Sequence, residues 1–270
     1  MPAPLDLASA LEALRRQRPL VHNITNYVAM NSSANLLLAM GASPAMLHAR
    51  EEVVEFVGLA DVLSINLGTP SPAWAEAMLQ AAKAAQVQGK PWVLDPVAVG
   101  ATAYRRQLAA TLLDASPTLI RANPSEILAL DGMANPGRGV DATDSTANAT
   151  QAAIRLARHH ACLVAVTGEY DLVTDGQRHV LVHGGHELMP TVTTLGCGLS
   201  AVAGAFIAAS PRDTFNACVA ALTSFAVAGS QAAHDARGPA SFQVAFIDAL
   251  YQLTPEQLAA QANVEVTNAL

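Results

Sequence analysis

Four short apolar runs alternate with helix-forming segments, and this alternation constrains the fold more than any other feature of the chain. The runs are DVLSINL (61–67), PWVLDP (91–96), PTLIRANPSEI (117–127) and ACLVAVTG (161–168). Continuous apolar runs of this length are typical of strands that are buried on both faces of a sheet. Strands and helices in alternation predict an α/β fold with a mainly parallel sheet. In such folds ligands bind beyond the carboxyl ends of the strands.

The other elements are predicted from hydrophobic spacing and turn residues. DLVTDGQRHVLVHGG (171–185) is typical of a hairpin around Asp175-Gly176, which would form an antiparallel edge of the sheet. GRGVDATDS (137–145) is predicted to be a loop that caps the following helix. After residue 209 the chain is predicted to be helical to its end. No linker, low-complexity tract or internal repeat is found, so we expect residues 1–270 to form a single domain. The predicted helices cover about 5–17, 26–40, 50–58, 72–88, 103–114, 143–160, 213–235, 240–252 and 255–262.

Residues 190–209, PTVTTLGCGLSAVAGAFIAA, contain the most suggestive local pattern. The segment begins with a β-branched run, is predicted to turn sharply through Gly196-Cys197-Gly198, and continues as a small apolar helix. A glycine turn that opens a helix presents unpaired backbone N–H groups and the positive end of the helix dipole. This segment is therefore a candidate anion site, and phosphate is the usual occupant of such sites.

Charged and polar residues follow two of the predicted strands. Asp95 and Glu126 are carboxylates at successive strand ends, where they could belong to a Mg²⁺ shell through water. Each also has a structural alternative, because Asp95 precedes a proline turn and Glu126 could form a capping box with Asn123. Arg121 lies at the end of a buried strand and needs an anionic partner, which could be a nucleotide phosphate or a structural carboxylate.

The composition argues against several kinds of partner. The net charge of −7 disfavours nucleic acids and anionic membranes. The longest apolar stretches, near 201–209 and 217–229, are too short to cross a bilayer, and the N-terminal segment lacks the apolar centre of a secretory signal. The three cysteines include no C-x-x-C pair and suggest no disulfide framework. We expect a soluble protein of the reducing cytoplasm.

Three other interpretations of the 190–209 segment are weaker. Neither lysine, Lys83 or Lys90, stands in the G-x-x-x-x-G-K-[ST] pattern of a Walker-type phosphate loop. The match to the dinucleotide pattern G-x-G-x-x-A lacks the acidic residue about twenty positions later, since none occurs between Asp213 and Asp235. A nucleophilic role for Cys197 would need a histidine partner, and the sequence ties none to it. A cysteine hydrolase stays a minor alternative.

The segment PLVHNITNYVAMNSSANLLLAMGASPAML (19–47) is unusually rich in asparagine. Its amides could cap turns and satisfy the backbone, and Asn26 could cap a helix that Gly41 ends. Four amides within thirteen residues, beside His22 and Met46, also suggest a polar lining for a small ligand. Both interpretations are open on these residues alone.

Six motifs occur along the chain in a characteristic order and spacing. They are PLVHNITNYVAMNSSANLLLAMGASPAM, DPVAVGATAYR, IRANPSEI, AVTGEYDLVTDG, TTLGCGLSAVAGAF and GPASFQVAFIDALYQL. Over nearly the whole chain they resemble the hydroxyethylthiazole kinase family. The resemblance implies a single-domain ribokinase-like three-layer sandwich, with a mainly parallel central sheet and helices on both faces. It further implies phosphorylation of 4-methyl-5-(2-hydroxyethyl)thiazole in thiamine salvage, with ATP as co-substrate and Mg²⁺ as cofactor. It also implies a homotrimer with sites at subunit interfaces.

The resemblance also implies roles for individual residues. Cys197 takes the position at which most ribokinase-like enzymes have the catalytic aspartate, beside the hydroxyl that attacks the γ-phosphate in line. We expect that Cys197→Asp keeps or raises kcat. The other implied roles are substrate binding for Met46, Asn26 and Thr194, ATP binding for Arg121, Thr167 and Gly196, and metal binding for Asp95 and Glu126.

The chain departs from the family pattern at three positions. Thr194 and Leu195 stand where the family usually has glycine and threonine, and Ala98 stands where it tends to have glycine, which we expect to be the milder change. A β-branched residue at 194 could hinder close approach of the backbone to a ligand. Two alternatives are therefore kept: another ribokinase-like kinase of the hydroxymethylpyrimidine or pyridoxal type, and a homologue that binds thiazole without turnover.

Overall fold

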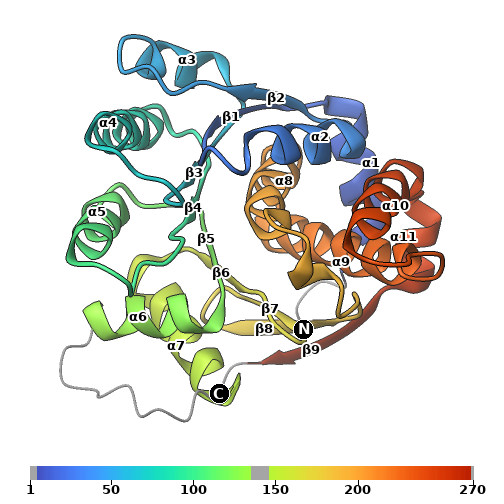
Figure 1. The fold of residues 1–270 in the computed structure, drawn as a ribbon. Coiled ribbons are helices and arrows are strands. Elements are labelled where there is room, and N and C mark those ends of the chain that lie inside the picture. Colours follow the sequence, from blue (N-terminus) through green and yellow to red (C-terminus); the bar gives the residue numbers. More distant parts are fainter. Residues whose placement is uncertain (1–4, 135–145, 269–270) are drawn as a thin grey trace.

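The computed structural model describes residues 5–134 and 146–268, which form one nine-stranded sheet between two layers of helices (Figure 1). The strand order is β2-β1-β3-β4-β5-β6-β7-β8-β9. β1 to β6 pair with one another in parallel, whereas the pairs β6–β7, β7–β8 and β8–β9 are antiparallel. The predicted α/β class, with its mainly parallel sheet and three layers, is confirmed.

The described elements have the following bounds. The strands are β1 Leu20–Ile24, β2 Ser43–Met46, β3 Val62–Asn66, β4 Trp92–Asp95, β5 Leu119–Ala122, β6 Leu163–Val166, β7 Asp171–Thr174, β8 Arg178–His183 and β9 Asn263–Asn268. The helices are α1 Leu7–Gln17, α2 Met30–Met40, α3 Val53–Leu59, α4 Pro72–Gln88, α5 Ala103–Leu113, α6 Pro124–Ala134, α7 Thr146–His160, α8 Leu195–Ala209, α9 Thr214–Ala232, α10 Pro239–Gln252 and α11 Pro255–Gln261, with a short 3₁₀ helix η1 Met189–Thr191. The loop predicted at 137–145 lies outside the described residues.

The sheet separates two hydrophobic cores, which explains the continuous apolar runs in the sequence. Helices α3 to α7 cover one face, and α1, α2 and α8 to α11 cover the other (Figure 1). The core under α3 to α7 is called the first core, and the core under α1, α2 and α8 to α11 the second core. In β3, Leu63 and Ile65 belong to the first core, whereas Val62 belongs to the second. A strand of a sheet that is covered on both faces has no side chain facing water, so apolar residues occupy successive positions.

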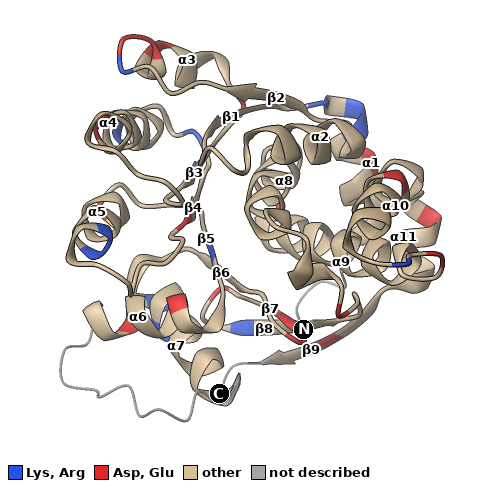
Figure 2. Ribbon diagram, viewed as in Figure 1, with Lys and Arg blue, Asp and Glu red and all other residues tan. Residues whose placement is uncertain are grey.

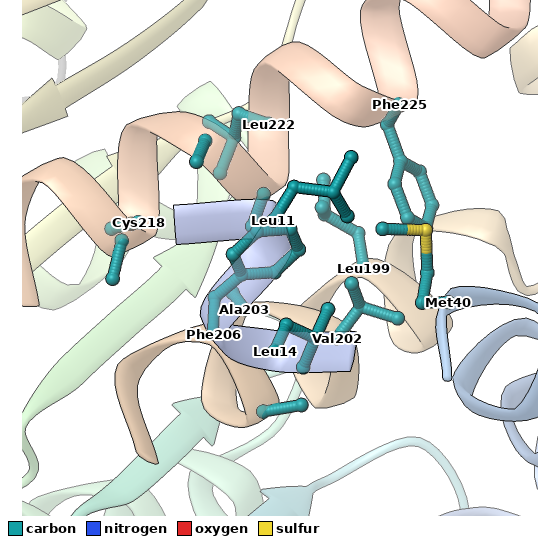
Figure 3. Close-up of a cluster of buried hydrophobic side chains, with 14 of the residues drawn as sticks. Leu11, Leu14, Met40, Leu199, Val202, Ala203, Phe206, Cys218, Leu222 and Phe225 are labelled. Carbon is teal, nitrogen blue, oxygen red and sulfur yellow. The ribbon is translucent and has the colours of Figure 1, made fainter. Parts of the chain in front are cut away.

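Helix α8 is the central helix of the second core. It contains no charged residue, as Figure 2 shows for both α8 and α9, and α8 is buried on all sides. Its glycine Gly204 allows close packing on the sheet, because a Cβ there would lie 3.1 Å from Val93 Cγ2. No helix in the described residues is long and apolar enough to cross a membrane. Figure 3 shows part of this core, formed by Leu11, Leu14, Met40, Leu199, Val202, Ala203, Phe206, Cys218, Leu222 and Phe225.

The end of the chain differs from the prediction. Residues 263–268 form β9, which pairs antiparallel with β8 from His183↔Asn263 to Arg178↔Asn268. The expectation of a helical end is therefore wrong, and β9 rather than the β7–β8 hairpin forms the edge of the sheet. The alternation of Val264, Glu265 and Val266 is the strand signal that was available in the sequence.

Candidate active site

The carboxyl ends of β3, β4 and β5 bring the predicted polar residues together. Asn66 and Asp95 are paired in register at the ends of β3 and β4. Arg121 on β5 places its Nη1 3.7 Å from Asp95 Oδ2. Asp95 and Arg121, from neighbouring strands, therefore form an ion pair. The sequence left open whether the anionic partner of Arg121 is a phosphate or a carboxylate, and this pair supplies a carboxylate.

Asp95 is completely buried. Its Oδ2 accepts hydrogen bonds from Asn66 Nδ2 and Ser200 Oγ, each at 2.7 Å. Burial raises the pKa of Asp95 to about 6, even though Arg121 and the hydrogen bond from Ser200 act to lower it. The other oxygen, Oδ1, has no hydrogen-bond partner within the described part of the chain.

A cavity of about 570 Å³ lies beside this cluster, and all three predicted ATP-binding residues line it. Arg121 donates a hydrogen bond from Nη2 to the hydroxyl of Thr167. Gly196 leaves room for the guanidinium beside α8, because a Cβ at this position would lie 2.7 Å from Arg121 Nη1 and would displace it. The rest of the wall comes from the segment after β6, the loop after β8 and helix α9, including Gly168, Tyr170, Gly184, Gly185, Phe225 and Ala226.

Helix α8 begins earlier than predicted, and the sharp turn falls on Thr194. Thr194 has φ +75°, whereas Gly196 and Cys197 already belong to the first turn of the helix. The first helical hydrogen bond is donated by Gly198 N to Thr194 O at 2.9 Å. The N–H groups of residues 195–197 therefore precede the helical hydrogen-bond ladder, and the predicted anion-binding character of this segment is retained.

Thr194 adopts this left-handed conformation at a steric cost, since it is β-branched. Its hydroxyl forms hydrogen bonds with the hydroxyl of Ser32 on α2 and with the carbonyl of Thr193. These bonds tie the turn to α2. The glycine that the family usually has at this position would reach the same conformation without strain.

Cys197 is a half-buried thiol at the start of α8. Burial raises its pKa to about 11, and the negative charge of Asp95 adds to this effect. The sulfur accepts a hydrogen bond from Asn26 Nδ2 at 3.5 Å. The thiol is protonated at neutral pH, so the alternative of a cysteine hydrolase, which needs a lowered pKa, is disfavoured.

Asn26 has the turn-capping role that the sequence offered as one of two interpretations. Its Oδ1 accepts hydrogen bonds from the backbone N–H groups of Val28 and Ala29, and its Nδ2 donates to Asn66 Oδ1 at 2.8 Å. It caps the turn before α2 rather than the helix itself, which begins at Met30. Its amide nitrogen also reaches the Cys197 sulfur.

The predicted substrate residues lie outside the large cavity. Met46 ends β2, is half-buried and lies next to Asn23 of β1 in the sheet register. Neither Met46, Asn26 nor Thr194 lines the cavity that contains the ATP-binding candidates. Asn26 contacts Cys197, whereas Arg121 of the ATP-binding group contacts Asp95.

Glu126 has the structural role that was considered beside metal binding. Its Oε2 accepts from Asn123 N at 2.9 Å, while Asn123 Oδ1 accepts from Glu126 N at 2.9 Å, which completes a capping box. Its Oε1 accepts from Ala98 N at 2.8 Å. Ala98 has φ +55°, so replacing glycine at this position is less mild than expected. Within the described ranges, no group of three His, Cys, Asp or Glu side chains could hold a metal ion.

Two site residues, Asn66 and Ser200, were not identified from the sequence. Asn66 occupies the same strand-end position on β3 that Asp95 occupies on β4, and this equivalence was the available signal. Ser200 gave no signal, because a serine within an apolar helix is ordinarily bonded to its own helix.

Comparison with known proteins gives a consistent result. The model of the hydroxyethylthiazole kinase family matches residues 11–256. Hydroxyethylthiazole kinases of Rhizobium etli (strain CIAT 652) and Cereibacter sphaeroides (strain ATCC 17023) are each 56% identical to this chain, over 95% and 94% of its length and 99% and 97% of theirs. The structure of hydroxyethylthiazole kinase from Pyrococcus horikoshii OT3 superposes with a TM-score of 0.90 at 39% identity, covering 97% of this chain and 98% of that one. A pyridoxal kinase from Staphylococcus aureus in complex with ADP shares the fold, with a TM-score of 0.65 at 17% identity over 93% of this chain and 99% of that one.

Proposed function

This chain belongs to the hydroxyethylthiazole kinase family, and we propose that it transfers the γ-phosphoryl group of ATP to the hydroxyl of 4-methyl-5-(2-hydroxyethyl)thiazole. The observation that carries this proposal is the arrangement at the start of α8. Gly196 of the first turn lines a cavity together with Arg121 and Thr167, and Cys197 on the same turn contacts Asn26. In this proposal the cavity takes the phosphates of ATP, and the alcohol binds beside Cys197 and Asn26.

The residues proposed for ATP are Arg121, Thr167 and Gly196. Arg121 offers a planar guanidinium to phosphate oxygens, and its hydrogen bond to Thr167 supports its orientation. The N–H groups at the start of α8 supply further donors to the transferring phosphoryl group. Gly196 leaves room between these two sets of donors.

Asp95 is the residue that we propose for Mg²⁺. Its buried Oδ1 lacks a partner among the described residues, and a carboxylate oxygen is the kind of ligand that Mg²⁺ prefers, directly or through water. Glu126 would act from further out, because both of its oxygens already accept backbone N–H groups. When bound with ATP, Mg²⁺ supplies positive charge against the phosphate oxygens.

The reaction forms one O–P bond and breaks one. The substrate hydroxyl oxygen attacks the γ-phosphorus in line, the bond to the β-phosphate oxygen breaks, ADP leaves and the hydroxyl proton is released. Cys197 lies beside the hydroxyl in this proposal, with its own proton in place at neutral pH. A loose phosphoryl-transfer transition state needs positioning and charge balance more than a strong base. Asn26, Met46 and Thr194 are the residues proposed for the thiazole side.

The test is phosphorylation of the thiazole alcohol with ATP and Mg²⁺, followed as ADP release and as the mass of the product. Hydroxymethylpyrimidine and pyridoxal serve as comparison alcohols. We expect the highest kcat/KM with the thiazole. A higher value with either comparison alcohol would reassign the substrate, and an absence of ADP formation with all three would indicate a binding protein.

We also propose a homotrimer with sites at subunit interfaces, in a cytoplasmic protein whose residues 1–270 act as one domain. Exposed apolar side chains on the described chain, including Tyr27 next to Asn26 and Leu38 on α2, support an interface. Analytical ultracentrifugation tests this proposal. We expect three times the mass of one chain, and a monomer would contradict it.

A further inference from the structure

Asp95 is held through only one of its two carboxylate oxygens. Oδ2 accepts from Asn66 Nδ2 and Ser200 Oγ, each at 2.7 Å, and lies 3.7 Å from Arg121 Nη1. Oδ1 is buried to the same degree, yet no described residue donates to it. Burying a carboxylate oxygen without a donor is unfavourable, so this asymmetry points to a ligand.

Arg121 carries a complementary unpaired group. Its Nε is buried and has no acceptor within the described residues, and its side chain lines the large cavity. The Asp95–Arg121 ion pair therefore presents one unpaired acceptor and one unpaired donor. A ligand that is itself a cation paired with an anion would satisfy both, and a magnesium–nucleotide complex has this chemistry.

We propose that Asn66 and Ser200 are positioning residues that fix the Asp95 carboxylate with Oδ1 directed to the metal–nucleotide complex. The inference rests on the proposed kinase function, because it takes Mg²⁺ and a nucleoside phosphate as the ligand. Two donors on the same oxygen resist rotation of the carboxylate. Outer partners of this kind govern the orientation of a metal ligand and the affinity of its site.

The amide of Asn66 can adopt only one orientation. Its Oδ1 accepts from Gly68 N and from Asn26 Nδ2, both at 2.8 Å, and a flipped amide would place N–H groups against these two donors. Asn66 Nδ2 must therefore point to Asp95. The same side chain thereby links the Asp95 carboxylate to Asn26 on the thiazole side.

Ser200 departs from the usual behaviour of a buried helical serine. Such a serine bonds to the carbonyl four residues earlier, as Ser224 does with Ala220 O at 2.7 Å. Ser200 lies 3.3 Å from the equivalent carbonyl of Gly196 but only 2.7 Å from Asp95 Oδ2. The hydroxyl proton of Ser200 is therefore donated to Asp95 on the sheet. Ser224, which donates to its own helix, provides a matched control.

The experiment compares Ser200→Ala with Ser224→Ala by measuring ADP binding calorimetrically, once with Mg²⁺ and once with EDTA. In the wild-type protein we expect Mg²⁺ to tighten ADP binding. Ser200→Ala should reduce this Mg²⁺-dependent gain by about tenfold or more while leaving the Kd in EDTA within about twofold. Ser224→Ala should leave both Kd values unchanged. The proposal would be overturned if Mg²⁺ tightened ADP binding to Ser200→Ala as much as it does to the wild type. It would also be overturned if Ser200→Ala lost ADP affinity equally with Mg²⁺ and with EDTA.

Asn66→Ala provides a second variant, with thermal unfolding as the check that each protein is folded. It removes the other donor to Oδ2, and we expect the same selective loss of the Mg²⁺-dependent gain. If only one variant folds, the result with that variant decides. Failure of the proposed function would look different, since wild-type protein would then bind ADP more tightly with Mg²⁺ but would not phosphorylate the thiazole.

Discussion

The Cys197 thiol differs chemically from the carboxylate that most ribokinase-like enzymes are expected to have in its place. With a pKa of about 11, only about one thiol in ten thousand is ionised at pH 7. Aspartate at this position would be far more ionised, even with its pKa raised by burial and by Asp95. We expect Cys197→Asp to keep kcat or to raise it by up to about tenfold, which is less than the roughly 10²- to 10⁴-fold of a full general-base contribution, because positioning supplies most of the catalysis here. Steady-state kinetics at saturating ATP and thiazole measure this change.

Cys197→Ser is the control for that prediction, because it preserves the size of the side chain without supplying a base. Its kcat should equal the wild-type value or fall below it. A Cys197→Asp enzyme that folds and binds both substrates but loses turnover would contradict the prediction.

Ala98 carries a conformational cost that a single substitution can remove. At φ +55° an alanine is disfavoured by about 1 to 2 kcal/mol, whereas glycine loses roughly 0.5 to 1 kcal/mol through its greater freedom in the unfolded chain. Ala98→Gly should therefore raise the free energy of unfolding by about 0.5 to 1 kcal/mol, and Tm by about 1 to 3 °C. Differential scanning calorimetry measures both.

The matched control is Ala101→Gly, three positions later in the same loop. Ala101 is exposed and does not have a positive φ, so glycine there brings only the entropic cost. We expect a lower Tm for Ala101→Gly. Equal shifts in the two variants would show that backbone strain at Ala98 is not what the substitution relieves.

The contact between helices α2 and α8 depends on Gly198. A Cβ at this position would lie 2.2 Å from Leu36 Cδ1, and Leu36 is fully buried in the second core. We expect Gly198→Ala to lower the free energy of unfolding by about 1 to 3 kcal/mol, as overpacking does. Urea denaturation measures the change.

Two controls isolate the cause of that destabilisation. Gly132→Ala lies within α6 and meets nothing within 4 Å, so it should stabilise the protein by up to about 1 kcal/mol. In a Leu36→Ala background, the added Cβ has room, and Gly198→Ala should lose most of its cost. A full cost in that background would mean that α2 is not the obstacle.

Helices and strands were predicted correctly from the sequence where hydrophobic patterning alone decides the structure. The runs at β3, β4 and β6 are continuous and apolar because both faces of the sheet are covered, and α4 was predicted with its observed bounds because Ser71-Pro72 and Gly89 mark its ends. β9 was missed because it is short and depends on pairing with a distant strand. The start of α8 was displaced because Thr194 adopts a conformation that its residue type disfavours.

The candidate site was predicted less completely, for a different reason. Residue type and strand position were enough to select Asp95 and Arg121. Hydrogen bonds such as those from Ser200 and Asn66 to Asp95 join residues far apart in the chain, and no local pattern encodes them. Glu126 fits two roles by sequence, and only its backbone partners reveal the capping one.

The stability of the whole molecule should respond to His22 in acid. The pKa of His22 is lowered to about 4, mainly by burial and to a smaller extent by nearby His48, although a hydrogen bond with Leu47 O opposes this shift. The folded state therefore binds this proton more weakly than the unfolded state does. The resulting stability is complete above pH 6.5 and is lost as the pH falls towards 4, by about 3 kcal/mol in total.

Urea denaturation of the wild type and of His22→Gln between pH 7 and pH 4 measures this contribution. Asp95 and Asp171, whose pKa values burial raises to about 6, change stability in the opposite direction over part of this range, so the difference between the two proteins is the relevant quantity. The wild type should lose more stability than His22→Gln as the pH falls. Parallel pH profiles would show that His22 does not contribute.

The position of β9 has a consequence for how the protein is made. β8 lies between β7 and β9, so one of its edges stays open until η1, α8 to α11 and β9 have been synthesised. At about 5 to 20 residues per second, this interval lasts for several seconds on the ribosome. During that time the nascent chain presents an unpaired strand edge to other proteins. Closure of this edge of the sheet therefore waits for β9, long after β8 itself has been made.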